Sequence, residues 1–192
     1  MRRAALGIAL VLVVAGCGGS SDTISANDLG KRVLQPADLG KPFSAFGNGP
    51  QIGIDNSGTP RADPTRFGRQ GGWIARYHRS GDRTTKGPLV VESRVDVFKN
   101  ESGATSDFGE YRTMLTQQPG VTPHSIPPPA IGDAAFATTF TQPGGLTPRF
   151  FRIAWRYRNA TASVTVEGWD GKLTRAEAVA LARKQQARLQ RG

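Results

Sequence analysis

The stretch RFFRIAWRYRNATASVTVE, residues 149–167, carries the clearest strand pattern in the chain. Apolar and aromatic side chains occupy every second position over Phe151–Tyr157, and most of the positions between them are arginines. A turn is expected at Asn159-Ala160, and apolar residues alternate again after it. A period of two residues is typical of a strand with one buried face. The stretch therefore predicts two neighbouring strands, Arg149–Arg158 and Thr161–Glu167.

Similar patterns extend in both directions from this pair. Alternation also predicts strands over Trp73–Arg79, Leu89–Phe98 and Ala134–Thr141. An apolar stripe at helical spacing predicts a helix over Glu101–Gln118 that begins with Ser102 as its cap. The residues Thr174-Arg175-Ala176-Glu177 form a capping box, which predicts a second helix that runs to about Leu189.

The order of these elements is strands, helix, strands, helix, with links short enough for hairpins. This order predicts the α+β class: an antiparallel β-sheet covered by helices, a sandwich, in a single globular domain over residues 29–192. Before the first strand, Ile24–Gly30 and Leu34–Gly40 each predict a short helical turn that a glycine ends, and Gly47–Gly72 reads as a long loop. The expected core comprises Trp73, Val91, Val95, Phe108, Tyr111, Leu115, Phe151, Ile153, Trp155 and Val164.

The element order resembles two known kinds of domain. It is similar to the PsbP-like sandwich and to the extracytoplasmic sensor domains of some actinobacterial kinases. The resemblance spans roughly residues 29–190, and it depends on the element order and on the Leu34–Leu39 opening, without a catalytic motif. It implies the same layered fold and a position outside the cytoplasm.

The N-terminus predicts export and lipid attachment. Two arginines precede an apolar run, Ala4–Ala15, of 12 residues. As a helix this run would span about 18 Å, too short for a hydrocarbon core of about 30 Å, so residues 1–16 read as a signal peptide. The residues Val14-Ala15-Gly16-Cys17 resemble the lipobox of bacterial lipoproteins, in which the cysteine is acylated.

The resemblance to lipoproteins has consequences for Cys17 and for the residues after it. It implies a covalent diacylglycerol and an acyl chain on Cys17, which is the only cysteine in the chain. No other cofactor is expected. Two or more chains hold a protein stably on a membrane, whereas a single chain does not. Residues 17–28 are therefore expected to form a lipid anchor and a flexible tether at the extracytoplasmic face of the cell membrane.

The positive charge suggests an anionic partner. The formal net charge is +10, from 25 basic and 15 acidic residues. Arg152, Arg156 and Arg158 would share one face of their strand, so their guanidinium groups suit an anionic polymer, a lipid or an envelope protein. A solvated sheet face in an arginine-rich protein would show the same pattern. The aromatic residues lie on the opposite face, as core, so we expect no nucleic-acid partner.

The sequence shows no motif for catalysis or for metal binding. The two histidines, His78 and His124, have no cysteine or histidine at metal-ligand spacing, and neither a nucleophile elbow nor a zinc-protease helix is present. We therefore expect no catalytic residue and no metal. The predicted function is that of a lipid-anchored, monomeric, non-enzymatic binding or accessory domain with an unknown ligand or partner. The alternative is a surface enzyme that acts on cell-wall or lipid material.

Overall fold

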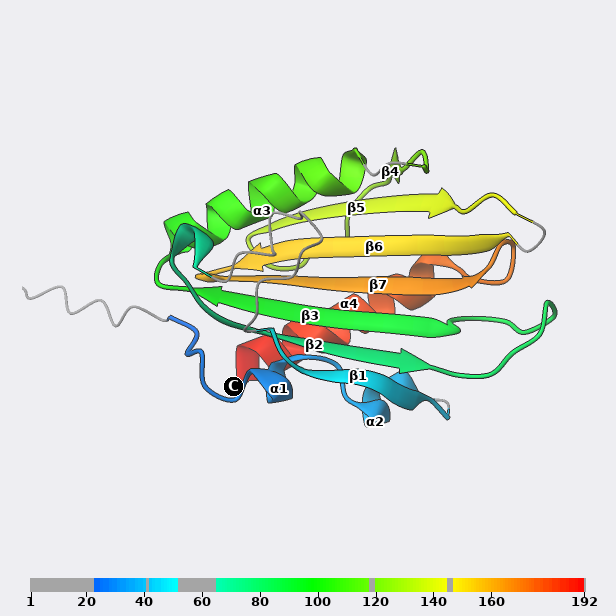
Figure 1. Cartoon of the computed structure of the whole chain (residues 1–192), viewed down its shortest axis with the longest axis horizontal. Coiled ribbons are helices and arrows are strands. Elements are labelled where there is room, and N and C mark those ends of the chain that lie inside the picture. Colours follow the sequence, from blue (N-terminus) through cyan, green and yellow to red (C-terminus); the bar gives the residue numbers. More distant parts are fainter. Residues whose placement is uncertain (1–22, 41, 52–64, 118–119, 145–146, 192) are drawn as a thin grey trace, which may run out of the picture.

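The computed structural model describes residues 23–40, 42–51, 65–117, 120–144 and 147–191. Within them, one antiparallel sheet has the strand order β1-β2-β3-β7-β6-β5-β4 (Figure 1). The strands are β1 (Ser44–Pro50), β2 (Arg69–His78), β3 (Val90–Phe98), β4 (His124–Ser125), β5 (Ala134–Thr141), β6 (Pro148–Tyr157) and β7 (Ala160–Trp169). The predicted α+β class, with an antiparallel sheet and helices in a single domain, is confirmed.

The inner face of the sheet packs against α4 (Arg175–Arg191) and the short helices α1 (Leu29–Arg32) and α2 (Pro36–Leu39). In Figure 1, α4 lies behind the strands. Alternate side chains of β3, β6 and β7 point to this face, and Trp155 is completely buried there. The capping box is present, because Thr174 N–H donates to the Glu177 carboxylate at 3.0 Å and Glu177 N–H donates to Thr174 Oγ1 at 3.3 Å. The predicted apolar face of α4, Ala178, Leu181, Ala182 and Leu189, is buried.

The outer face carries α3 (Glu101–Thr116), which crosses the β5 and β6 side of the sheet. Tyr111 and Leu115 of α3 form a second apolar cluster with Phe136 of β5 and Ala154 of β6. The cap of α3 is Asn100, whose side-chain oxygen accepts from Gly103 N–H at 2.9 Å, so the prediction of Ser102 as the cap is wrong. Of the ten expected core residues, Trp73, Phe108 and Phe151 are only partly buried, and the other seven are buried.

Two local predictions need correction. Both ends of the expected Gly47–Gly72 loop are strands, since β1 runs to Pro50 and β2 begins at Arg69, after the 3-10 turn η1 (Arg66–Gly68). Glycine and proline obscure β1 in the sequence, but an edge strand tolerates them because only one of its sides is hydrogen-bonded. The turn between β6 and β7 lies at Arg158-Asn159, one residue earlier than expected.

The packed domain begins before residue 29. Ile24 is buried in the main core. Its N–H donates to Asn159 Oδ1 at 2.7 Å, and its carbonyl accepts from Asn159 Nδ2 at 3.1 Å. The expected tether, residues 17–28, therefore includes a segment that belongs to the folded domain. Gly30 lies within α1 and does not end it, whereas Gly40 ends α2 in the left-handed conformation, with φ +65°.

Candidate functional site

The structure places the three predicted arginines in three different settings. Strand β6 ends at Tyr157, and Arg158 follows in the turn with a left-handed φ of 54°. The guanidinium carbon of Arg158 lies 5.0 Å from the centre of the Tyr157 ring. The expected straight row of three is therefore not formed, because the chain reverses before Arg158 can extend it.

Arg156 anchors the start of α3. Its guanidinium forms ion pairs with Glu101, the first residue of α3, and with Asp133, whose oxygen lies 3.3 Å away. Only 14% of the Arg156 side chain is exposed. The expectation that this arginine stands on an open face is therefore wrong, since the N-terminal turn of α3 pairs with it.

Arg152 lies on β6 close enough to Tyr111 of α3 for the two groups to interact. Its guanidinium carbon is 4.7 Å from the centre of the Phe140 ring, and Phe140 stacks on Phe150 with 4.6 Å between centroids and an interplanar angle of 4°. Burial lowers the pKa of Arg152 despite the opposing influence of Tyr111 and Glu92. The guanidinium is thus held in a partly desolvated position against an aromatic pair.

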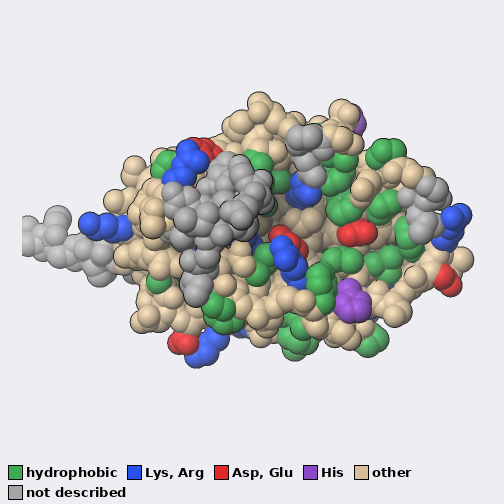
Figure 2. Space-filling view, viewed as in Figure 1, with side chains coloured by type: hydrophobic (Ala, Val, Ile, Leu, Met, Phe, Trp, Pro, Cys, Tyr) green, Lys and Arg blue, Asp and Glu red, His purple; other side chains and the backbone are tan. Residues whose placement is uncertain are grey.

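The strand register places Arg152 in a larger surface on the outer face. One cross-strand row runs Arg76, Glu92, Thr165, Arg152 over β2, β3, β7 and β6, and the next row runs His78, Val90, Glu167, Phe150 over the same strands. We call these eight residues the outer platform. Figure 2 shows this face, where acidic, basic and hydrophobic side chains mix around a histidine to the right of the grey atoms.

Charges on the outer platform cancel. The arginines Arg76 and Arg152 balance the glutamates Glu92 and Glu167. Arg76 Nε donates to Glu92 Oε2 at 2.8 Å. Glu167 is different, because its carboxylate has no side-chain or backbone partner among the described residues, and burial raises its pKa. The platform therefore offers one satisfied ion pair and one half-buried carboxylate that lacks a hydrogen-bond donor.

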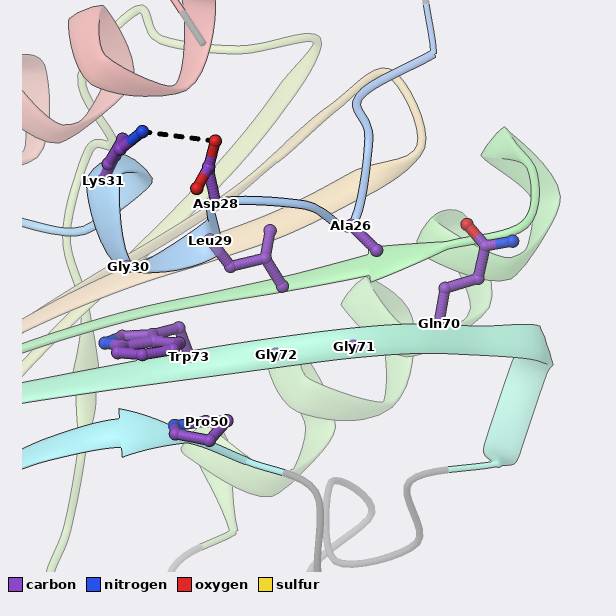
Figure 3. Close-up of a pocket in the computed structure, with 10 residues that line it drawn as sticks. All are labelled: Ala26, Asp28, Leu29, Gly30, Lys31, Pro50, Gln70, Gly71, Gly72 and Trp73. Atoms are coloured by element: carbon purple, nitrogen blue, oxygen red, sulfur yellow. Dashed lines mark ion pairs between the residues drawn. The ribbon is translucent and has the colours of Figure 1, made fainter.

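A second candidate site is a pocket of about 420 Å³ between α1 and β2 (Figure 3). Leu29 and Trp73 contribute apolar walls, and the backbone of Gly71 contributes part of the lining. The Trp73 ring is fixed, since its Nε1 donates to Asn48 Oδ1 at 2.6 Å. A Cβ added at Gly71 would lie 3.3 Å from Leu29 Cδ1, so any side chain there would enter the space beside Leu29.

A buried ionic cluster nearby joins Asp96 with Arg69 and Arg94. Asp96 is completely buried and pairs with Arg69 at 2.6 Å and with Arg94 at 2.7 Å. Burial alone would lower the pKa of Arg94, but the charge and hydrogen bond of Asp96 outweigh it, and the pKa is raised. Gly72 leaves room for this cluster, because a Cβ there would lie 2.3 Å from Asp96 Oδ1. The cluster holds β2 and β3 together.

The remaining sequence predictions concern Cys17, His78, metal binding and membrane-spanning helices. Cys17 lies outside the described residues. His78 is exposed on the outer face beside Arg76, as its alternation predicts. No group of three His, Cys, Asp or Glu side chains in the described ranges could hold a metal ion, and no helix in those ranges is long and apolar enough to cross a membrane.

Sequence reasoning missed Glu92, Glu167 and Phe150 as members of one surface. Each of the two glutamates lies at a polar position of an alternating strand. The sequence therefore predicts which face of the sheet their side chains occupy. Their proximity depends on the strand order β2-β3-β7-β6, which joins segments distant in the chain. The short links predict the neighbours β2-β3 and β6-β7, but the pairing of β3 with β7 has no local sequence signal.

The architecture defines a class, an extended antiparallel sheet with one long helix on each face. It is similar to the solved extracellular domain of PknH from Mycobacterium tuberculosis, with a TM-score of 0.64 and 12% sequence identity, over 90% of this chain and 100% of that domain. This agrees with the fold expected from the resemblance to extracytoplasmic sensor domains. No protein-family model matches the chain, and neither does any curated protein.

Proposed function

We propose that this protein is a lipid-anchored, non-enzymatic binding domain on the extracytoplasmic face of the cell membrane. The observation that supports the proposal is that the N-terminal segment and the folded domain both indicate a position outside the cytoplasm. The first 17 residues resemble a lipoprotein signal with its cysteine, and the folded part is similar to the extracellular domain of a kinase. The covalent diacylglycerol and acyl chain on Cys17 are the only lipid groups that the proposal requires.

The length of the tether supports a position close to the bilayer. Ile24 is packed in the core, seven residues after Cys17. An extended chain spans at most about 3.5 Å per residue, so this link reaches about 24 Å. A domain on such a short link stays near the membrane surface, where it meets lipids, wall polymers and other envelope proteins.

The site that best supports binding is the outer platform. It combines aromatic rings, guanidinium groups and carboxylates on a rigid sheet, and Arg152 from the predicted anion-contact face belongs to it. Sheet-borne side chains keep their positions, which reduces the entropy lost on binding. We propose that the domain binds through this face as a monomer and performs no chemistry.

Cys17→Ala in the full chain tests the anchor. Because Cys17 carries the only thiol, the variant should lose metabolic palmitate labelling completely and should leave the membrane fraction after washing with salt. Asp28→Ala, an exposed substitution after the cysteine, serves as the control and should label like the wild type. Labelling that persists in Cys17→Ala would contradict lipid attachment at this position.

A further inference from the structure

From the outer platform we infer that the ligand of this domain is a neutral oligosaccharide, bound across β2, β3, β7 and β6. The inference deepens the proposed binding function by giving its ligand a chemical class. It depends on three features of the platform: its balanced charge, its hydrogen-bonding groups and its aromatic boundaries.

The charge balance disfavours a polyanion. Long-range attraction of a polyanion needs an excess of positive charge at the site. On the outer platform, Glu92 and Glu167 cancel Arg76 and Arg152, although the whole chain carries +10. An anionic polymer on this surface would lie against both carboxylates, whereas an uncharged ligand meets no such repulsion.

The hydrogen-bonding groups match hydroxyls. A hydroxyl group donates one hydrogen bond and accepts others, so it suits a surface that alternates acceptors and donors. Along the first row, Arg152 donates, Thr165 both donates and accepts, and Glu92 accepts. The half-buried Glu167 carboxylate in the second row is a hydrogen-bond acceptor with no protein donor among the described residues, so its open side can accept from a ligand hydroxyl. A sugar hydroxyl would supply that donor.

The aromatic residues mark the limits of the surface. One face of Phe150 stacks against Phe140, and Glu167 is the cross-strand neighbour of Phe150 on β7. At the other end, His78 packs edge-on against Phe46, with 5.5 Å between centroids, and Phe46 is the only exposed large hydrophobic side chain among the described residues. Three strand spacings, about 14 Å, separate β6 from β2. Ring faces at this separation suit the apolar faces of a short chain of sugar rings.

The test uses the full chain, purified from membranes in detergent, on a printed array of neutral oligosaccharides with their carboxylated and sulfated counterparts. We expect binding to at least one neutral oligosaccharide, with an affinity that does not change between low and high salt. In titrations with that oligosaccharide, Glu167→Ala should weaken the affinity roughly tenfold or more, because hydrogen bonds to charged groups contribute about 1.5–3 kcal/mol. Phe150→Leu, which keeps apolar volume but removes the ring face, should weaken it as well.

Two control variants locate the site. Asp28→Ala removes an exposed carboxylate beside α1 and should bind like the wild type. Gly71→Leu fills space in the pocket between α1 and β2 and should also bind normally. If Gly71→Leu lost binding of the neutral oligosaccharide and Glu167→Ala kept it, the ligand would bind in the pocket between α1 and β2. That result would overturn the inference.

Other outcomes overturn the inference without affecting the anchor. Binding confined to carboxylated or sulfated members, with affinity that falls as salt rises, would identify an anionic polymer instead. The inference would also be wrong if the wild type bound no neutral oligosaccharide on the array more strongly than Glu167→Ala does. Palmitate labelling of Cys17 is read separately, so failure of lipid anchoring and failure of glycan binding are distinguishable.

Discussion

Asn159 is the residue that ties the most distant segments together. It is 3% exposed, and its side chain bonds both backbone groups of Ile24 and also donates to the Phe98 carbonyl at 2.7 Å. Asn159→Ala removes all three bonds, and each buried bond contributes about 0.5–1.5 kcal/mol, so the free energy of unfolding should fall by about 2–4 kcal/mol. Urea unfolding measures this, with Asn27→Ala as an exposed control. A loss under about 0.5 kcal/mol would contradict the buried network.

Glu167 makes stability depend on pH. Burial raises the pKa of its carboxyl, so the folded state holds the proton more tightly than the unfolded state. This stabilisation is complete below the unfolded pKa of about 4.3 and is lost as pH rises through the folded pKa. Glu167→Gln cannot ionise, so it should be more stable than the wild type at neutral pH and equally stable at acidic pH.

Thermal melts across the pH range measure this difference. Glu92→Gln is the matched control, because Glu92 is paired with Arg76 and its removal should not stabilise the protein at neutral pH. A Glu167→Gln variant whose advantage grows as pH falls would contradict the assigned sign.

At the scale of elements, α3 shows what the sequence can predict. Its apolar spacing identified the helix and its buried side, and Leu115 is 2% exposed in the second cluster. Leu115→Ala should lower the free energy of unfolding by about 2–5 kcal/mol, since a buried leucine leaves a cavity. Thr113→Ala, on the exposed side of α3, should stay within about 0.5 kcal/mol of the wild type. Equal effects of the two substitutions in chemical denaturation would show that α3 faces the other way.

Elements without periodicity were harder to predict. The residues of β1, SAFGNGP, contain two glycines and a proline, and their strand conformation comes from pairing with β2 at the sheet edge. The start of β2 includes Gly71 and Gly72, and two consecutive glycines are typical of a loop. Gly72 is needed in this strand because the side chains of Arg69 and Asp96 occupy the space that a Cβ would take. Tertiary contacts override local preference in both strands.

At the scale of the whole molecule, the candidate site arises from topology. Arg76, Glu92, Arg152 and Glu167 lie on four strands that are consecutive in the sheet but not in the chain. The sequence predicted the polar facing of Arg152 and the neighbouring strand that carries Glu167, but it could not bring Glu92 beside them, because β3 pairs with β7 across a long stretch of chain. It also suggested an exposed row with Arg156, because nothing local indicates that Glu101 at the start of α3 pairs with that residue.

The first described residues, from Thr23 onward, complete the packing of the domain. The last prediction concerns their contribution to its stability. A chain that starts at Thr23 keeps Ile24 in the core and keeps its two hydrogen bonds to Asn159, whereas a chain that starts at Leu29 loses them. Burial of the isoleucine contributes about 1.5–3 kcal/mol and each hydrogen bond about 1 kcal/mol.

The shorter chain should therefore be less stable by about 3–5 kcal/mol. Both chains should unfold cooperatively without reductant or metal in calorimetry, since neither contains a cysteine. Equal stability of the chains that start at Thr23 and Leu29 would show that the domain begins at α1, with residues 23–28 as part of the tether.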